Sequence, residues 1–363
     1  MNQFSQKDCF QFSFPLEQPE TLHDLGEHHF GFVERESVSR DEEARNSLAG
    51  EYHIPVKPSF VITVEQGFYE IKVKIGSPKV EGITSVKSGL GHIILENIHT
   101  KYNERKEYIF TVEAVHGQLS FLFYGENPVV EGLEIKRVTN GYTIYLAGDS
   151  TVTDQPAGQY PYYGWGQSLS SFLNQNVAVS NHAHSGRSTK SFMTERRLER
   201  ILNQIKKGDF LFIQFAHNDE KDNEGGTLAD STYRDYLKKY IDSAKEKGAM
   251  PVLITPMHRR QFDENGKIIN THQKYIEAMK QVALQNGVIC LDLAAESKDL
   301  FERLGKQETK KLFMWSKPGE YELHPNGTED NTHFTEMGAS EIAALVVSQM
   351  RQHRSLQGLL KHP

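Results

Sequence analysis

Apolar runs of strand length alternate with helical patterns from Tyr142 onward, and this alternation restricts the possible folds more than any other feature of the sequence. Strands that alternate with helices form parallel sheets covered by helices on both faces. The sequence predicts strands at 142–147, 176–181, 209–215, 250–255 and 288–292. It predicts helices at 164–174, 190–206, 229–247, 271–286, 294–304 and 335–352.

The last helix has a clear start signal, because Thr335 can cap it and Glu336 places an acid in its first turn. The stretch 305–331 before it has no clear period. We expect a long loop there, and so long a loop in a compact domain is usually functional or disordered.

The first 138 residues have a different pattern, with short alternating runs separated by turn signals. In the run 67–75, for example, every second side chain is apolar, so that one face of the strand is apolar and the other charged. This spacing predicts an antiparallel β-sandwich. The charged segment 37–51 reads as a surface loop. The predicted strands are 60–64, 67–75, 92–96, 107–115, 118–124 and 130–137.

The periodicity changes after 138–141, so we expect two domains, a β-sandwich at 1–138 and an α/β domain at 139–363. The net charge is −7, which gives no indication of nucleic acid or of an anionic membrane as a partner. No apolar stretch is long enough to span a bilayer, and the N-terminus lacks the apolar segment of a secretory signal, so the expectation is a cytoplasmic protein. The oligomeric state is left open.

Polar residues follow the predicted strands at the edge where open α/β sheets carry their chemistry. Gly148-Asp149-Ser150 ends the first strand, and a glycine there lets the chain turn so that the serine hydroxyl projects from the tip. Similar stretches follow the second and third strands and precede the last helix. Because parallel strands end at one edge, these distant loops can converge. The four stretches are 148–151, 182–189, 216–219 and 330–333.

These residue types fit acyl transfer. A serine hydroxyl is a weak nucleophile unless a base removes its proton, and His333, oriented by Asp330, could serve Ser150 in this way. Negative charge on the attacked carbonyl oxygen requires fixed donors. The candidates are the backbone N–H groups of Ser150 and Gly186 and the side-chain amide of Asn218.

The combination resembles the SGNH (GDSL-type) hydrolase superfamily, whose blocks carry Ser, Gly, Asn and His in this order over residues 142–352. Within this superfamily, the sequence motifs are most similar to those of the rhamnogalacturonan acetylesterase-like branch. The stretches that carry the resemblance are Gly148-Asp-Ser-Thr151, Gly164-Trp-Gly166, Gly186-Arg-Ser188, His217-Asn-Asp219 and Asp330-Asn-Thr-His-Phe334.

The resemblance implies a flavodoxin-like α/β/α domain that needs no cofactor or metal, with Ser150, Asp330 and His333 as the catalytic triad. Gly186 and Asn218 would complete the oxyanion hole with Ser150. It further implies that the substrate is an acetylated, pectic oligosaccharide. Some members carry an N-terminal β-sandwich similar to carbohydrate-binding modules, as residues 1–138 would here.

Several other residues have two interpretations. Arg187 could reach an acidic sugar or pin its loop through a salt bridge. Trp165 and Trp315 could each stack on a sugar ring or fill a core position. Asp149 is expected to anchor the nucleophile loop. Four further histidines are interpreted as ordinary surface or core residues, namely His182, His184, His258 and His324.

The leading hypothesis is therefore a serine esterase that deacetylates carbohydrate, with xylan as an alternative to rhamnogalacturonan. A metallophosphoesterase is a remote alternative, because the chain lacks an early Asp-x-His pair at a strand end and two-metal sites need several converging ligands. A sugar-binding protein that has lost its activity is the third. Cys9 and Cys290 are too few and too far apart for a disulfide framework or a thiolate metal site.

Overall fold

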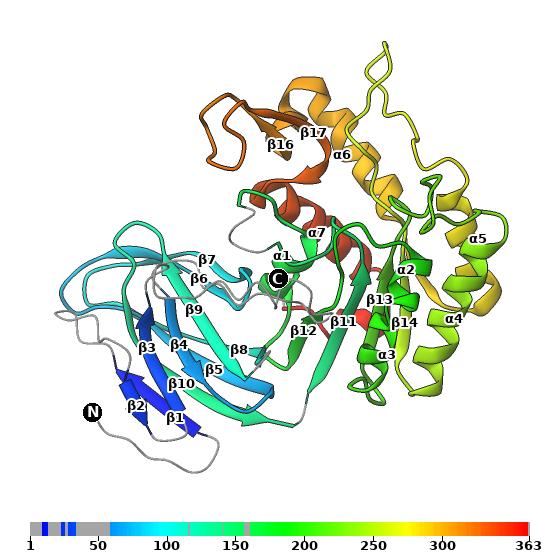
Figure 1. Ribbon diagram of the computed structural model, residues 1–363. Helices are drawn as coiled ribbons and strands as arrows, with labels where there is room; N and C mark the ends of the chain where they lie inside the picture. Colours follow the sequence, from blue (N-terminus) through cyan, green and yellow to red (C-terminus); the bar gives the residue numbers. More distant parts are fainter. Residues whose placement is uncertain are drawn as a thin grey trace.

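The computed structural model describes residues 9–13, 23–25, 28–33, 59–114, 117–139, 141–155 and 160–361. Antiparallel strands occupy the N-terminal part, and an α/β part follows from Tyr142 onward (Figure 1). The segment 37–51, predicted as a surface loop, lies outside the described residues. Among the described residues, no helix is long and apolar enough to cross a membrane.

Two antiparallel sheets pack face to face in the N-terminal part, as the alternating runs predict. One sheet has the order β1-β10-β5-β8 and the other β2-β3-β4-β9-β6-β7. Buried side chains from both sheets, such as Ile71, Ile135, Ile62 and Phe121, form one core between them. The strands are β1 Cys9–Ser13, β2 His23–Leu25, β3 His28–Val33, β4 Ser59–Thr63, β5 Gly67–Gly76, β6 Gly82–Ser88, β7 His92–Thr100, β8 Arg105–Ala114, β9 Gln118–Tyr124 and β10 Val130–Val138.

The strand β6 was not predicted, because its sequence is mostly polar. Two of its buried polar side chains have backbone partners instead of water. The Thr84 hydroxyl accepts the backbone N–H of Val129 at 2.9 Å, and that of Ser85 accepts the N–H of Asn97 at 2.9 Å. Hydrogen bonds of this kind offset the free-energy cost of burying polar side chains. The strands β1, β2 and β3 were likewise not predicted.

The five predicted parallel strands are confirmed, with ends that differ from the prediction by at most one residue. All neighbours pair in parallel, in the order β12-β11-β13-β14-β15. Numbered by chain position this order is 2-1-3-4-5, the flavodoxin-like one, whose switch point lies between β11 and β13. The strands are β11 Tyr142–Gly148, β12 Val177–Asn181, β13 Phe210–Gln214, β14 Met250–Ile254 and β15 Ile289–Leu291.

Helices cover both faces of this sheet. Ile144 and Leu146 of β11 belong to the same core as residues of α1, α6 and α7, whereas Tyr145 and Ala147 point to the opposite core with α3, α4 and α5. The alternation follows from the two-residue period of a strand. The helices are α1 Trp165–Leu169, α2 Thr189–Thr194, α3 Arg197–Leu202, α4 Thr232–Glu246, α5 Tyr275–Asn286, α6 Leu293–Glu308, α7 Glu336–Met350 and α8 Arg354–Gln357.

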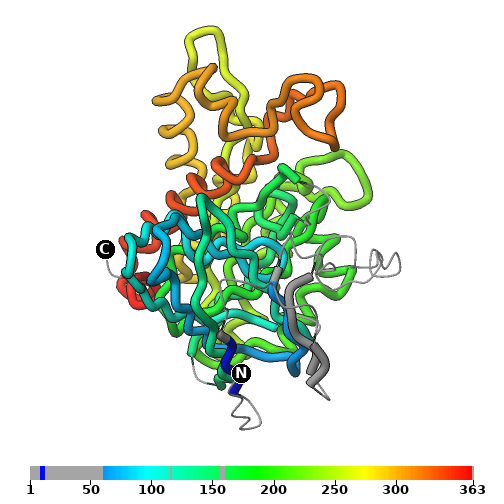
Figure 2. Tube along the Cα trace, turned by 90° about the vertical axis from the view of Figure 1, so that its left-hand side faces the viewer, coloured from blue at the N-terminus to red at the C-terminus, as the bar shows by residue number. Residues whose placement is uncertain are grey.

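The expectation of a long loop at 305–331 is wrong. The helix α6 continues to Glu308 across a kink at Gly305, where φ is 74°. An antiparallel hairpin follows, made of β16 Phe313–Ser316 and β17 Thr328–Phe334. In both views the hairpin lies at the end of the molecule away from β1 (Figures 1 and 2). The segment 330–333 is therefore held in a strand.

Candidate active site

Ser150 lies in a tight turn directly after β11. A Cβ on Gly148 would come within 2.6 Å of the Val152 side chain, so the turn has no room for a larger residue there. Asp149 is fully buried and its Oδ1 accepts both the backbone N–H of Thr151 at 3.0 Å and the Thr151 hydroxyl at 2.7 Å. Asp149 thus anchors the turn, as expected, and Ser150 is 8% exposed at its tip.

The Ser150 hydroxyl lies beside a histidine from the other end of the α/β part. The distance between Ser150 Oγ and His333 Nε2 is 2.8 Å, and the distance between His333 Nδ1 and Asp330 Oδ2 is 2.7 Å. Burial alone would raise the pKa of Asp330, but hydrogen bonds with His333 and Thr332 and the imidazole charge hold that pKa below its ordinary value. The Asp330 carboxylate is therefore ionised at neutral pH.

The strand β17 has a fixed position because its end is packed and bonded. Phe334 is fully buried and its ring packs against Phe313 of β16, with ring centroids 5.1 Å apart. The carbonyl of Phe334 accepts the backbone N–H of Tyr163 at 3.0 Å. Thr335 then caps α7 by accepting the N–H of Gly338, which confirms the predicted helix start. These contacts leave His333 little freedom to move away from the serine.

The loop after β12 lies beside the nucleophile turn. The backbone N–H of His184 donates to the carbonyl of Gly148 at 3.0 Å, and the Thr153 hydroxyl donates to the carbonyl of Ala183 at 2.7 Å. Gly186 has a φ of 80°, a left-handed conformation that favours glycine, and a Cβ there would meet no atom within 4 Å. The backbone at Gly186 therefore borders open space.

Asn218 follows β13 and bonds to the same loop. Its side-chain N–H donates to the carbonyl of Arg187 at 3.1 Å, and its Oδ1 accepts from the Lys221 ammonium at 2.7 Å. A primary amide has two N–H donors. Among the described residues only one of them has a partner, and this bond ties Asn218 to the residue that follows Gly186.

Asp219 is buried between the second and third loops. It accepts hydrogen bonds from the backbone and hydroxyl of Thr189 and from the hydroxyl of Thr227 at 3.0 Å. Burial, partly offset by these bonds, raises the pKa of Asp219 to about 7. The carboxyl group links the start of α2 to the segment after Asn218, so it holds the two loops together.

Arg187 makes a salt bridge within its own region. Its Nε lies 2.9 Å from a carboxylate oxygen of Glu195, and its Nη1 donates to the carbonyl of Ser185 at 2.8 Å. Glu195 also pairs with Arg197 at 2.8 Å. Of the two interpretations of Arg187, these contacts support the one in which it pins its loop.

Of the two interpretations of Trp165, the structure supports the core position, because the side chain is fully buried and cannot stack on a sugar as it stands. Its indole N–H donates to Gln214 Oε1 at 2.9 Å, and Gln214 Nε2 donates to the Thr151 hydroxyl at 2.8 Å. Sequence reasoning missed Gln214, although a glutamine inside the apolar run 209–215 was a visible signal. Trp165 and Gln214 therefore support the nucleophile turn through the Thr151 hydroxyl.

Trp315 is partly buried on β16. Its indole N–H donates to Asn331 Oδ1 at 3.0 Å, the same atom that accepts from Arg260 Nη1 at 3.0 Å. The Arg260 guanidinium lies 4.7 Å and the Lys310 ammonium 4.0 Å from the ring centroid. Trp315 is thus held by cation–π contacts beside the strand that carries His333.

Tyr162 is a further neighbour of the histidine that the sequence did not single out. Its ring lies edge to face with His333, with centroids 5.7 Å apart, and makes a similar contact with His324 at 5.4 Å. Burial raises the pKa of Tyr162, so its phenol is neutral at ordinary pH. The ring contributes to the wall against which the His333 imidazole rests.

Four further histidines lie in partly or fully buried positions, namely His182, His184, His217 and His258. Burial lowers the pKa of His182, His184 and His258 to about 4, and it lowers that of His217 well below its usual value. All four are therefore neutral at pH 7. Within the described ranges, no group of three or more His, Cys, Asp or Glu side chains is arranged as a set of metal ligands.

Comparison with known proteins gives a consistent family. The model of the GDSL-like Lipase/Acylhydrolase family matches residues 146–328. Rhamnogalacturonan acetylesterase RhgT of Bacillus subtilis is 46% identical over 209 residues, which are 58% of this chain and 89% of that protein. The probable rhamnogalacturonan acetylesterase YesY of the same organism is 43% identical over 212 residues, 58% of this chain and 92% of its own.

The N-terminal part also has a structural counterpart. The crystal structure of the protein YxiM from Bacillus subtilis aligns with a TM-score of 0.54 and 26% identity, covering 82% of this chain and 81% of YxiM. Residues from 139 onward cannot supply 82% of the chain, so the likeness extends into the β-sandwich.

Proposed function

The chain belongs to the GDSL-like lipase/acylhydrolase family and is a carboxylic ester hydrolase, and we propose that it removes O-acetyl groups from rhamnogalacturonan oligosaccharides. The relatives named as rhamnogalacturonan acetylesterases support an acetylated carbohydrate as the substrate class. Their identity of 43–46% over nearly their whole length supports the pectic sugar over other acetylated glycans.

The observation that carries the proposal is the 2.8 Å distance between Ser150 Oγ and His333 Nε2. His333 takes the hydroxyl proton as Ser150 Oγ attacks the acetyl carbonyl carbon, and it then donates this proton to the departing sugar oxygen. Water attacks the resulting acetyl-serine, with His333 again as the base. Acetate leaves and the serine hydroxyl is restored.

Asp330 orients His333 in this scheme and stabilises the imidazolium that forms. Its ionised carboxylate accepts the Nδ1–H at 2.7 Å, which leaves Nε2 free to accept the serine proton. The oxyanion donors in the proposal are the backbone N–H groups of Ser150 and Gly186 and the second amide N–H of Asn218. Each such donor is typically worth about 3–4 kcal/mol of barrier.

We also propose the division of the chain into a β-sandwich at 1–138 and a catalytic domain at 139–363. The strand β10 ends at Val138 and β11 begins at Tyr142, so the boundary falls in a short connection. A carbohydrate-binding role for the sandwich stays a prediction, and so does a sugar contact of Trp315.

The test has two stages. We expect turnover of p-nitrophenyl acetate that a chelator does not affect and that Ser150→Ala lowers by about 10⁴-fold or more. Chelator-sensitive phosphatase activity, or sugar binding without turnover, would contradict the proposal. Acetylated rhamnogalacturonan, xylan and chitin oligomers are then compared by mass spectrometry, and loss of 42-Da acetyl units about tenfold faster from the first is expected. Faster loss from xylan would overturn the pectic substrate alone.

A further inference from the structure

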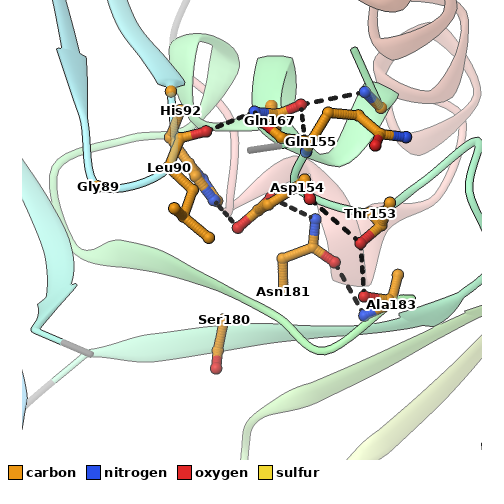
Figure 3. Close-up of polar contacts among 12 residues, drawn as sticks. Gly89, Leu90, His92, Thr153, Asp154, Gln155, Gln167, Ser180, Asn181 and Ala183 are labelled. Carbon is orange, nitrogen blue, oxygen red and sulfur yellow. Dashed lines mark hydrogen bonds and ion pairs between the residues drawn. The ribbon is translucent and has the colours of Figure 1, made fainter. Parts of the chain in front are cut away.

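We propose that the turn between β6 and β7 of the β-sandwich, residues 89–91, together with His92 at the start of β7, is a positioning element of the active site. It acts through the segment 153–155, which directly follows the nucleophile turn (Figure 3). The inference rests on the proposed function, since it assigns a task in the Ser150–His333 reaction to a part of the chain outside the α/β fold.

The first connection is an ion pair between the two parts. His92 Nε2 lies 2.7 Å from Asp154 Oδ2, and both side chains are nearly buried, with 12% and 13% exposed. The other oxygen, Asp154 Oδ1, accepts from Asn181 Nδ2 at 2.7 Å, and the same nitrogen donates to the carbonyl of Val152 at 2.9 Å. His92 therefore fixes a carboxylate that lies four residues after Ser150.

Burial by itself would lower the pKa of His92. The charge of Asp154 and the hydrogen bond to it outweigh this effect and raise the pKa above its ordinary value. The bond has the character of a charge-assisted one, and such bonds are about twice as strong as neutral bonds.

The second connection reaches the serine backbone through two glutamines. Gln167 Nε2 donates to the carbonyl of Leu90 at 2.5 Å, and Gln167 Oε1 accepts the backbone N–H of Gln155 at 3.1 Å. Gln155 Nε2 in turn donates to the carbonyl of Ser150 at 3.0 Å. A continuous path of hydrogen bonds thus leads from the sandwich to the nucleophile.

The third connection reaches the histidine strand. The Tyr163 hydroxyl donates to the carbonyl of Gly91 at 2.7 Å, while the backbone N–H of Tyr163 donates to the carbonyl of Phe334. Phe334 follows His333 directly. Gly91 has a φ of 92°, and a Cβ there would lie 2.9 Å from the Tyr163 hydroxyl, so the close approach requires glycine.

The turn is itself held firmly against the α/β part. Ile93, the second residue of β7, is fully buried and belongs to the same core cluster as Ile144, Val152 and Leu169. An apolar residue shared between the two parts opposes relative sliding, because burying such a side chain is worth about 2 kcal/mol. The turn can therefore help to hold both Ser150 and His333 in position.

The expected effect follows from geometry. A displacement of about 1 Å between reacting groups can cost about 10²-fold in rate. Loss of the His92 contact should loosen the serine segment without removing any group that touches substrate. We therefore expect kcat to fall and KM to change little.

The experiment compares three variants in the full chain with p-nitrophenyl acetate. His92→Ala removes the bond to Asp154, whereas His92→Gln keeps a side-chain N–H that can donate to it. Thr111→Val is the matched control, because the Thr111 hydroxyl bonds across the same interface to the carbonyl of Gln175 at 2.6 Å, in a segment that does not support Ser150. Melting temperature is measured for each variant.

We expect His92→Ala to lower kcat about 10- to 100-fold at a temperature where it is fully folded, with recovery of most of this loss in His92→Gln. Thr111→Val should lower the melting temperature and leave kcat within twofold. Equal kcat losses in His92→Ala and Thr111→Val, or a kcat of the wild-type value in His92→Ala, would overturn the inference.

A double-mutant cycle covers the case in which a single variant is unstable. If His92 acts through Asp154, the losses in kcat of His92→Ala and Asp154→Ala should not add, and the double variant should resemble Asp154→Ala. Additive losses would overturn the inference. Failure of the proposed function is recognised separately, because Ser150→Ala would then retain activity whatever the His92 variants do.

Discussion

Asp330 holds His333 at two points, since one carboxylate oxygen contacts the imidazole Nδ1 at 2.7 Å and the other accepts the backbone N–H of His333 at 3.0 Å. The spacing of three residues within β17 allows both contacts. The acid therefore fixes the tautomer, the ring orientation and the local backbone together.

Asp330→Asn should separate control of the His333 tautomer from support of the local backbone. The amide oxygen can still accept the backbone N–H, but the amide cannot accept the Nδ1–H as a carboxylate does, so the wrong tautomer is favoured. We expect kcat for p-nitrophenyl acetate to fall by about 10³- to 10⁴-fold, with KM within a few-fold. A loss below tenfold would show that Asp330 is not part of the triad.

Asn218→Ala tests the oxyanion donor. Removal of one such donor typically costs about 10²- to 10³-fold in kcat. The control is Lys221→Met, which removes the other partner of the Asn218 side chain and leaves the amide N–H groups in place. Steady-state kinetics should show the large loss for Asn218→Ala only. Equal losses in both variants would indicate that Asn218 serves mainly to shape its loop.

Trp165→Phe tests the core role of this indole. The substitution leaves Gln214 Oε1 without its donor in a buried position, which costs about 1–3 kcal/mol. Urea unfolding should show this loss of stability, while the KM for an acetylated oligosaccharide should stay the same in the folded enzyme. A raised KM with unchanged stability would restore the sugar-stacking interpretation.

The buried histidines predict an acid-sensitive fold. Burial and nearby positive charges lower the pKa of His182, His184 and His258 to about 4 in the folded chain. The ordinary pKa of about 6.5 applies in the unfolded chain, which therefore binds more protons at intermediate pH. These groups stabilise the fold above pH 6.5, and this contribution is lost as the pH falls from about 6.5 to about 4.

Two measurements check this prediction. The free energy of unfolding should decrease steadily as the pH is lowered from about 6.5 to about 4. The decrease should be smaller in His258→Gln, which removes one of the three groups. Nuclear magnetic resonance of the imidazole C–H groups should place the three midpoints near pH 4. Midpoints near 6.5 would contradict the burial argument.

The parallel sheet and the meeting of Ser150 with His333 could be predicted from the sequence. The apolar runs define the strands, and the ends of parallel strands share an edge. The strand β6 could not be predicted, because its buried positions include the polar residues Thr84 and Ser85. The hairpin around Trp315 also escaped prediction, because β17 is mostly polar and has no alternating apolar pattern, although Pro318-Gly319 and Asn326-Gly327 are turn signals in the connection.

Ile93 gives the two parts of the molecule a common interior. A shortened enzyme that began at residue 139 would expose to water the apolar socket now filled by this isoleucine. Such a fragment would be prone to self-association, and a usable minimal esterase would need polar replacements on the exposed side of α1. The β-sandwich thus also shields an apolar surface of the α/β part from water.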